Sequence, residues 1–374
     1  MRLIAVVLIL LVSVTGTIAQ TLEIVAVGDI MAHSSNIKSA QQKNGIYDFS
    51  EVFLGVKDIL KTGDLTIGNL ETRFAGKERG FTGYPAFNCP EELAIALKDV
   101  GFNYLVTANN HSLDRGYSGI VATNAVLDKY GILHTGTYST QEESSKISVF
   151  EKKGMKIAIL NYTYGTNGIT LPKDKSFAVS YINNIKIESD IKRAELISDY
   201  IIVFLHFGNE YEVGKPNSTQ TGLVKKIFAA GADLVLGSHP HVVQNTEELS
   251  ISYQNKQKKV FVAYSMGNFV SGQTAKNTDI GQIIKLTIAK PDNSKKQYSK
   301  RLKLYRQDAK EVHMTVDSDI ASWQKNFKKE RISLKPRRCL GFKINIFWLF
   351  YPYMLNCRKI NTYVTEKSYT NKHF

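Results

Sequence analysis

The stretch Leu234-Val235-Leu236-Gly237-Ser238-His239-Pro240-His241 decides the fold class of this 374-residue chain. Its apolar run without polar alternation is typical of a strand buried on both faces, and Gly237-Ser238 marks the turn that ends it. Two imidazoles that stand two residues apart just past a strand are able to converge on one site, and Pro240 stiffens the backbone between them. The stretch therefore predicts an α/β sheet with metal-ligating side chains past its strand ends.

The same succession of an apolar run and a polar turn recurs on both sides of this stretch. Strands are predicted at residues 22–27, 65–70, 104–108, 156–160, 201–205 and 260–264, and residues 283–290 close the pattern. Six strand ends carry possible ligands or amides: Asp29, Asn69 with Glu71, Asn110 with His111, His206 with Glu210, His239 with His241, and Asn268. Because loops past the carboxyl ends of strands converge on one edge, we expect these side chains to meet there.

Helical spacing fills the intervals between these strands. Helices are predicted at residues 50–61, 91–100, 117–130 and 221–230, and the last two are followed by Gly131 and Gly231, where a left-handed cap is wanted. Residues 147–150 and 155–160 form a predicted hairpin through Lys152-Lys153-Gly154. The fold class is therefore α/β with a mixed sheet.

The two ends of the chain differ from this body. Residues 3–14 are uncharged, follow Arg2 and precede Thr17-Ile18-Ala19, so residues 1–19 predict a signal peptide and an exported protein. An uncleaved anchor is the alternative, although the apolar run is shorter than the ~20 residues that a spanning helix needs. No Cys follows the apolar run, which excludes lipoprotein attachment.

The net charge of +14 is concentrated in the C-terminal part. Residues 290–374 hold 20 Lys and Arg against 7 Asp and Glu, whereas the first 289 residues hold 28 against 27. We therefore expect a nearly neutral domain at residues 20–290, a basic tail at 291–374 and no nucleic-acid partner. The tail carries an aromatic cluster at residues 344–355 between basic patches, which favours either a solvated extension or contact with a membrane surface or a polyanion. Cys339 and Cys357 bracket this cluster, and whether they pair stays open.

Each strand-end motif has an ordinary structural interpretation when it is taken alone. Gly28-Asp29 suits a turn or a helix cap, Glu71 suits a solvated loop, and a backbone carbonyl would satisfy His206 as well as a metal would. Six such coincidences at the ends of one set of strands are improbable. An oxygen and imidazole ligand set without thiolate suits Mn, Zn, Fe or Mg, and two such ions would support a hydrolytic displacement.

Taken together, the motifs resemble those of the capsule synthesis protein CapA (poly-γ-glutamate synthesis, PgsA) family. The resemblance covers residues 22–290 and rests on these segments: Gly28-Asp29-Ile30-Met31, Gly68-Asn69-Leu70-Glu71, Ala108-Asn109-Asn110-His111, His206-Phe207-Gly208-Asn209-Glu210-Tyr211, Gly237-Ser238-His239-Pro240-His241-Val242 and Tyr264-Ser265-Met266-Gly267-Asn268-Phe269. That family is similar to calcineurin-like metallophosphoesterases. The resemblance therefore implies a sandwich of two mixed sheets flanked by helices, with a two-metal centre at one edge.

The resemblance also implies roles for individual residues. Asp29 and His241 would hold one ion, Glu71 would bridge, and the second ion would take Asn110, His206 and His239. His111 would be the general acid that protonates a leaving group. The remaining residues would support the ligands or contact substrate: His33, Asn69, Glu210 and Asn268. The sequence departs from the wider phosphoesterase pattern in having Met31 where that pattern has His, and Glu71 where it has Asp.

Two functions follow from these features. The first is an exported metal-dependent hydrolase or transferase that acts on a phosphoester or on a γ-glutamyl polymer in capsule synthesis. The second is a scaffold without catalytic activity that holds an acidic capsule polymer for export. No phosphate-binding loop of the Walker type and no Gly-x-Ser-x-Gly elbow is present in the sequence, so ATP-driven ligation and serine hydrolysis are not expected.

Overall fold

The computed structural model describes residues 20–289 in full, together with the backbone of β13 (Lys303–His313) and β14 (Val364–Lys367). The expected signal peptide, the aromatic cluster at 344–355, Cys339 and Cys357 lie outside the described residues. Within the part of the chain that is described, no helix is long and apolar enough to cross a membrane.

The first of two sheets has the strand order β14-β13-β12-β1-β2-β3-β4, and β11 (Asn268–Val270) lies beside β1. Its parallel strands are β1 (Thr21–Ile30), β2 (Leu65–Leu70), β3 (Tyr104–Val106) and β4 (Leu133–Thr135). On the other side of β1, β12 (Ile280–Ala289) and β13 are antiparallel, so this sheet continues beyond residue 290.

The second sheet has the order β5-β6-β7-β8-β10-β9. Its parallel strands are β6 (Met155–Thr163), β7 (Tyr200–His206), β8 (Leu234–Ser238) and β10 (Lys256–Ala263). The edge strands β5 (Ser148–Lys152) and β9 (Thr246–Tyr253) are antiparallel to their neighbours. The predicted hairpin is confirmed as β5 and β6, and Gly154 at its turn has a φ of 62°, which glycine adopts without strain.

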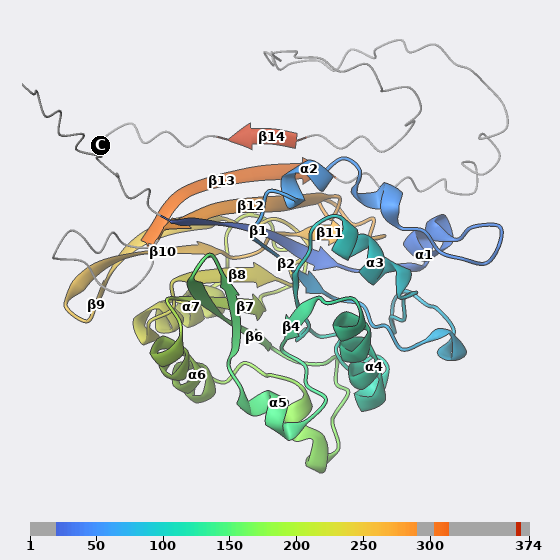
Figure 1. Ribbon diagram of the computed structural model, residues 1–374, viewed down its shortest axis with the longest axis horizontal. Helices are drawn as coiled ribbons and strands as arrows, with labels where there is room; N and C mark the ends of the chain where they lie inside the picture. The colour runs from blue at the N-terminus through green and yellow to red at the C-terminus, as the bar shows by residue number, and fades with distance from the viewer. Residues whose placement is uncertain (1–19, 290–302, 314–363, 368–374) are drawn as a thin grey trace, which may run out of the picture.

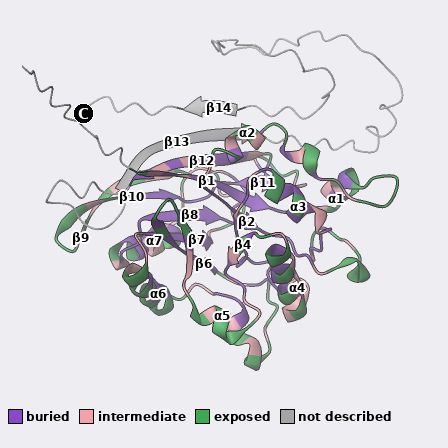
Figure 2. Cartoon of the chain, viewed as in Figure 1, coloured by how far each residue is buried: buried purple, intermediate pink, exposed green. Residues whose placement is uncertain are grey.

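Alternation along β1 shows how the two sheets pack. Leu22, Ile24 and Ala26 face the second sheet in a core that also contains Phe204 and Leu236. The intervening Val25 and Val27 belong to another core, on the outer side of the first sheet. Since successive side chains of a strand point to opposite faces, β1 is buried on both sides, as its continuous apolar run predicts. Figure 2 shows the same burial in the central strands of both sheets.

Helices cover the outer faces of this sandwich (Figure 1). Residues of α1 (Ser34–Ala40), α2 (Lys57–Leu60), α3 (Glu92–Asp99) and α4 (Gly116–Lys129) pack on the first sheet. Helices α6 (Asn184–Ile197) and α7 (Ser218–Ala230) pack on the second sheet, and α5 (Gln141–Ser145) follows β4. Three short 3-10 helices complete the described elements: η1 (Ser50–Phe53), η2 (Lys77–Arg79) and η3 (Lys173–Ala178). The predicted α/β sandwich of two mixed sheets flanked by helices is confirmed.

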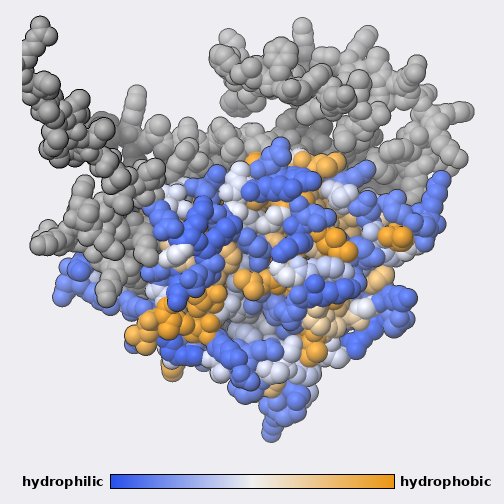
Figure 3. All heavy atoms as spheres, viewed as in Figure 1, coloured by the Kyte–Doolittle hydropathy of each residue, from blue (hydrophilic) through white to orange (hydrophobic). Residues whose placement is uncertain are grey.

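One helix prediction was wrong, and helices α1, α5 and α6 were not predicted. The helix predicted at residues 50–61 is interrupted, because residues 54–56 form a turn between η1 and α2, and Gly55 is a poor helix former at its centre. Helix α6 buries Ile187 and Ile191 but leaves Ile185 and Leu196 82% and 84% exposed, which blurs its amphipathic pattern. Figure 3 shows apolar surface over this helix.

Candidate metal centre

The predicted ligands of the two sheets meet at the carboxyl ends of the parallel strands. Asp29 lies near the end of β1 and Glu71 directly follows β2, while His206 ends β7 and His239 and His241 follow β8. All five side chains are buried. Three groups of residues each have ligand atoms within 4.8 Å of one another: Glu71, His206 and His239; Asp29, Glu71 and His241; and Glu210, His239 and His241.

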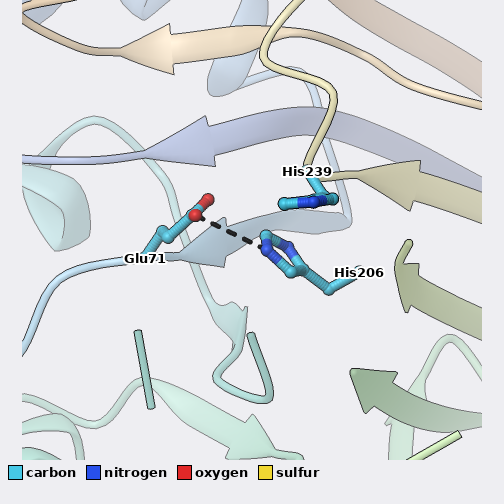
Figure 4. Close-up of side chains that lie close together, drawn as sticks. All are labelled: Glu71, His206 and His239. Carbon is cyan, nitrogen blue, oxygen red and sulfur yellow. Dashed lines mark ion pairs between the residues drawn. The ribbon is translucent and has the colours of Figure 1, made fainter. Parts of the chain in front are cut away.

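Glu71 lies between His206 and His241. Its Oε1 is 3.5 Å from Nε2 of His206 and 4.0 Å from Nε2 of His241. Figure 4 shows Glu71 facing His206 and His239 from the opposite side of the site. Glu71 is the only carboxylate that belongs to two of the three groups of ligand-type side chains found among the described residues; Asp29 and Glu210 belong to one each.

Asp29 is held by contacts from both sheets. Its Oδ2 is 3.1 Å from Nδ1 of His241 and accepts a hydrogen bond of 3.3 Å from the backbone N–H of His239. Its Oδ1 accepts a hydrogen bond of 2.8 Å from Nδ2 of Asn69. The same Nδ2 donates a hydrogen bond of 3.1 Å to Oε2 of Glu71. Asn69 therefore donates to both carboxylates and orients them.

Asn110 and Ser238 fix the ring of His206. Oδ1 of Asn110 is 2.8 Å from Nε2 of His206, and Oγ of Ser238 is 3.0 Å from its Nδ1. Asn110 thus lies beside the imidazole with which it was predicted to share an ion. Nδ2 of Asn110 donates to Oδ1 of Asn167 at 3.2 Å, which leaves the amide oxygen directed at the site.

The polypeptide backbone is strained where it presents the imidazoles. His239 and His241 have φ values of 100° and 59°, which non-glycine residues rarely adopt. A Cβ on Gly28 would lie 1.9 Å from the carbonyl oxygen of Gly267, so glycine is required next to Asp29 for β1 to approach this loop. Such conformations are typical of functional sites.

Burial and mutual repulsion shift the ionisation of the site in the metal-free protein. Burial, followed by the charge of Asp29, raises the pKa of Glu71 well above its usual range. Burial also acts to raise the pKa of Asp29, but its hydrogen bond to His241 and the charge of that ring hold the pKa below its usual value. Burial lowers the pKa of His206 strongly and that of His239 to about 3, so both rings are neutral at pH 7 and offer lone pairs.

His111 stands beside these ligands and belongs to none of the three groups. Its Nδ1 is 2.8 Å from Oδ2 of Asp114, which also accepts 2.7 Å from the backbone N–H of Phe87. The ring of Phe87 packs edge-on against His111 with centroids 4.7 Å apart. His111 is thus oriented by a buried carboxylate, an arrangement that suits a proton donor.

The other predicted residues divide between the site and its surroundings. Glu210 is exposed and belongs to the group of His239 and His241. His33 belongs to none of the three groups, and its Nδ1 accepts a hydrogen bond of 3.1 Å from the backbone N–H of Gly272. Burial lowers the pKa of His33 to about 4. Asn268 pairs with Asp29 in the sheet, but its side-chain amide donates to Gln273 and to the carbonyl of Thr278, away from the ligands.

Sequence reasoning missed two kinds of residue at this site. Arg73 is fully buried, donates to the carbonyl of Leu70 at 2.5 Å and leaves Nε and Nη1 without a partner. Burial lowers its pKa to about 10, against the opposing charges of Asp114 and Glu71. Three exposed tyrosines also border the ligands, and one of them, Tyr164, follows β6, whose end was predicted three residues too early at residue 160. A correct strand end would have placed Tyr164 among the residues of the edge.

The residues present fit divalent ions. Oε1 of Glu71 and Nδ1 of His239 are buried without a hydrogen-bond partner, which is costly unless another group satisfies them. The donors are carboxylates, neutral imidazoles and an amide oxygen, which suit Zn, Mn, Fe or Mg. Two positively charged ions would also remove the repulsion between Asp29 and Glu71.

The sequence resembles two curated CapA proteins. Among curated proteins, the chain is 29% identical over 260 residues to the PGA biosynthesis protein CapA of Bacillus subtilis (strain 168), covering 66% of this chain and 62% of that protein. It is 28% identical over 266 residues to the capsule biosynthesis protein CapA of Bacillus anthracis, covering 68% and 61%. The chain therefore spans less than two thirds of the length of either relative.

Among solved structures, the chain is similar to the calcineurin-like phosphoesterase YfkN from Bacillus subtilis, with 12% sequence identity and a TM-score of 0.43 over 78% of this chain and 90% of that one. The family described as bacterial capsule synthesis protein PGA_cap matches residues 23–273, which include all the predicted ligands. Because this match covers more than half of the sequence, the chain belongs to the bacterial capsule synthesis protein PGA_cap family.

Proposed function

We propose that this protein is a metal-dependent hydrolase that cleaves a phosphoester during capsule synthesis. The observation that carries the proposal is the set of three overlapping groups of carboxylates and imidazoles, with a buried and unpartnered oxygen of Glu71 between them. Asp29 and His241 would hold one ion, Asn110, His206 and His239 the other, and Glu71 both. When bound, two such ions supply Lewis acidity and positive charge for a hydrolytic displacement.

The side chains of the protein would position the substrate and move one proton. Asp114 holds His111 through Nδ1, so the opposite nitrogen, Nε2, is left to donate a proton to the departing oxygen. The carboxylate of Asp114 stabilises the ring while it is charged. Asn69 keeps both carboxylates oriented, so the ligands need little reorganisation when the ions bind.

The test is metal content and turnover of the full chain after loading with Mn or Zn. We expect close to two ions per chain and hydrolysis of bis(p-nitrophenyl) phosphate, and we expect His239→Ala to lose both an ion and the activity. Fewer than ~0.1 ion per chain in the wild type after loading contradicts the proposal, since such donor sets bind these metals tightly.

A second candidate is the scaffold that holds an acidic polymer, and Met31 is the observation that favours it. Met31 is buried where the wider phosphoesterase pattern has His, so the group of Asp29, Glu71 and His241 lacks one imidazole. A scaffold would bind poly-γ-glutamate without cleaving it and would not hydrolyse phosphoesters. Measuring both the binding and the cleavage of the polymer separates the two candidates.

We also propose export through residues 1–19 and surface attachment through the basic tail. The support is the sequence: an apolar run after Arg2, and 20 basic against 7 acidic residues after position 289. Because β13 pairs with β12, truncation at residue 290 would remove a strand of the sheet. Attachment is therefore better tested by changing Arg337, Arg338, Arg358 and Lys359 to Gln. Loss of salt-sensitive sedimentation with anionic vesicles supports the proposal, and unchanged sedimentation contradicts it.

A further inference from the structure

Three tyrosines surround the metal centre, and we call Tyr84, Tyr164 and Tyr211 the tyrosine rim. They are 71%, 49% and 45% exposed. In the described part of the chain they are the only tyrosines in the exposed class. Exposed aromatic side chains that occur only around one site indicate a binding surface, because scattered exposure would need no explanation.

Each member of the tyrosine rim contacts a histidine of the site. The ring centroid of Tyr164 is 4.5 Å from that of His239, and Tyr211 lies 6.3 Å from His241. Tyr84 lies 6.3 Å from His111, at the proton donor. The three rings therefore border both the ligands and the position from which the leaving group is protonated.

The backbone holds two members of the rim in place. The N–H of Tyr164 donates 3.1 Å to the carbonyl of His206, and the N–H of Tyr211 donates 2.8 Å to the carbonyl of Pro240. Tyr211 also has a φ of 65°, a conformation that disfavours a bulky residue. Both rings are thus tied to the segments that carry the imidazoles, so they are already in position before a ligand arrives.

The rim is poorly matched to a polymer of carboxylates. Tyrosine side chains carry no charge at neutral pH, so the rim offers no cation to a carboxylate. Glu210 is an exposed acid at this mouth. Neutral aromatic faces beside a carboxylate favour a ligand with an uncharged ring, and they offer hydroxyls for hydrogen bonds at its edge.

We propose that the tyrosine rim binds the ring of a sugar whose phosphoester is hydrolysed at the metal centre; this inference rests on the proposed function. The polarised C–H groups of a pyranose face suit the negative face of an aromatic ring, and phenol hydroxyls suit sugar hydroxyls. The ring would lie over Tyr164 and Tyr84, with its phosphoester directed at the ligands. The substrate class is therefore a sugar phosphoester.

The test compares two hydrolysis-resistant ligands by calorimetry on the metal-loaded full chain: glucosyl-methylphosphonate, which has a ring, and 2,3-dihydroxypropylphosphonate, which has none. We expect the ring ligand to bind at least ~10-fold more tightly, because each aromatic contact contributes about 0.5–1.5 kcal/mol. Tyr164→Leu should lower the affinity for the ring ligand by ~10-fold and leave the ringless ligand unchanged. Tyr164→Phe should keep most of the preference, since the ring is retained.

Tyr130→Leu is the matched control, because Tyr130 lies at the end of α4 and bonds to Glu91. It should change neither affinity. Equal affinities of the wild type for the two ligands, or equal losses for both in Tyr164→Leu, would overturn the sugar inference. So would a failure of glucosyl-methylphosphonate to compete while poly-γ-glutamate binds at the site. Binding of the ring ligand with no turnover of any phosphoester would instead contradict the proposed hydrolase, while the binding of a sugar ring by the tyrosine rim would still stand.

Discussion

The two sheets contribute different chemistry to the same edge. The first sheet supplies oxygen donors, from Asp29 after β1, Glu71 after β2 and Asn110 after β3. The second sheet supplies imidazoles, from His206 at the end of β7 and from His239 and His241 after β8. Two of the three groups combine side chains from both sheets, namely Glu71 with His206 and His239, and Asp29 and Glu71 with His241, so these two groups form when the sheets pack together.

This difference shows that the electrostatic cost of forming the site without metal falls mainly on the first sheet. On the first sheet, burial and repulsion raise the pKa of Glu71, which shows that two adjacent carboxylates are costly without cations. On the second sheet, burial lowers the pKa of His206 and His239 and keeps both rings neutral, so there is little electrostatic repulsion between them. The Asp29 to His241 contact of 3.1 Å joins the two sheets. Variants of the first sheet should therefore change stability and metal binding together, and variants of the second mainly metal binding.

The largest effect is expected from Glu71→Gln. The amide keeps the shape but removes the charge that both ions need, so the loaded protein should lose both ions and its phosphoesterase activity. The metal-free protein should become more stable, because burial and the charge of Asp29 disfavour ionisation of Glu71 in the folded state, a cost at pH 7 that Gln does not carry. Elemental analysis and thermal unfolding without metal measure the two effects. A less stable metal-free variant that still binds two ions contradicts this account of Glu71.

A smaller loss is expected from His239→Ala on the second sheet. Removing one imidazole should leave about one ion per chain, because Asp29, Glu71 and His241 keep their positions. The stability of the metal-free protein should change little apart from the lost packing. Retention of both ions would show that His239 is not a ligand.

His111→Asn should separate protonation from metal binding. The variant should keep its ions and lose turnover by roughly 10² to 10⁴ on substrates with poor leaving groups, since general acid catalysis contributes about that much. Substrates with activated leaving groups should lose much less. Asp114→Asn offers the matched comparison, because it removes the carboxylate that orients Nδ1. Equal losses on both substrate types would make His111 structural.

The sequence predicted well which side chains the strand ends bring together, because their signal is local. A buried strand followed at once by a polar turn fixes where Asp29, Glu71 and His206 lie along the chain, and parallel pairing brings strand ends together. Contacts between loops that are far apart in the sequence were beyond this reasoning. Nothing in the sequence brings Tyr84 to His111, or Tyr211 to His241.

The elements that were not predicted also depend on contacts that are distant in the sequence. Helix α6 escaped prediction because it places isoleucine and leucine on its exposed face as well as its buried one. Strand β9 escaped because its burial alternates weakly and it lies at the edge of its sheet. Elements whose stability comes from tertiary packing leave a weak local pattern.

The smallest effect concerns the opposite edge of the sandwich, where the sheets are joined without metal ligands. Asp64 precedes β2 and lies 2.6 Å from Nζ of Lys153 and 3.4 Å from Nζ of Lys152, in the β5 to β6 hairpin. Its Oδ2 also accepts 2.9 Å from the N–H of Glu23. Burial acts to raise the pKa of Asp64, but the bond to Lys153 and the bond from Glu23 hold it below 3.8. Asp64→Asn should therefore lower the free energy of unfolding at pH 7 by about 1 kcal/mol and leave metal content unchanged.

The pH dependence of this difference follows from the direction of the shift. A carboxyl with a lowered pKa in the folded state stabilises the protein above the pKa of the unfolded chain, and that stabilisation is lost as pH falls through the folded value. The gap between wild type and Asp64→Asn should thus be constant from pH 7 to about 5 and shrink below about pH 4. Urea unfolding at several pH values measures it. Glu142→Gln is the control, because Glu142 pairs with Lys146 on the exposed surface and should matter far less. A gap that persists at low pH would mean that packing of the side chain, and not its charge, joins the two sheets at this edge.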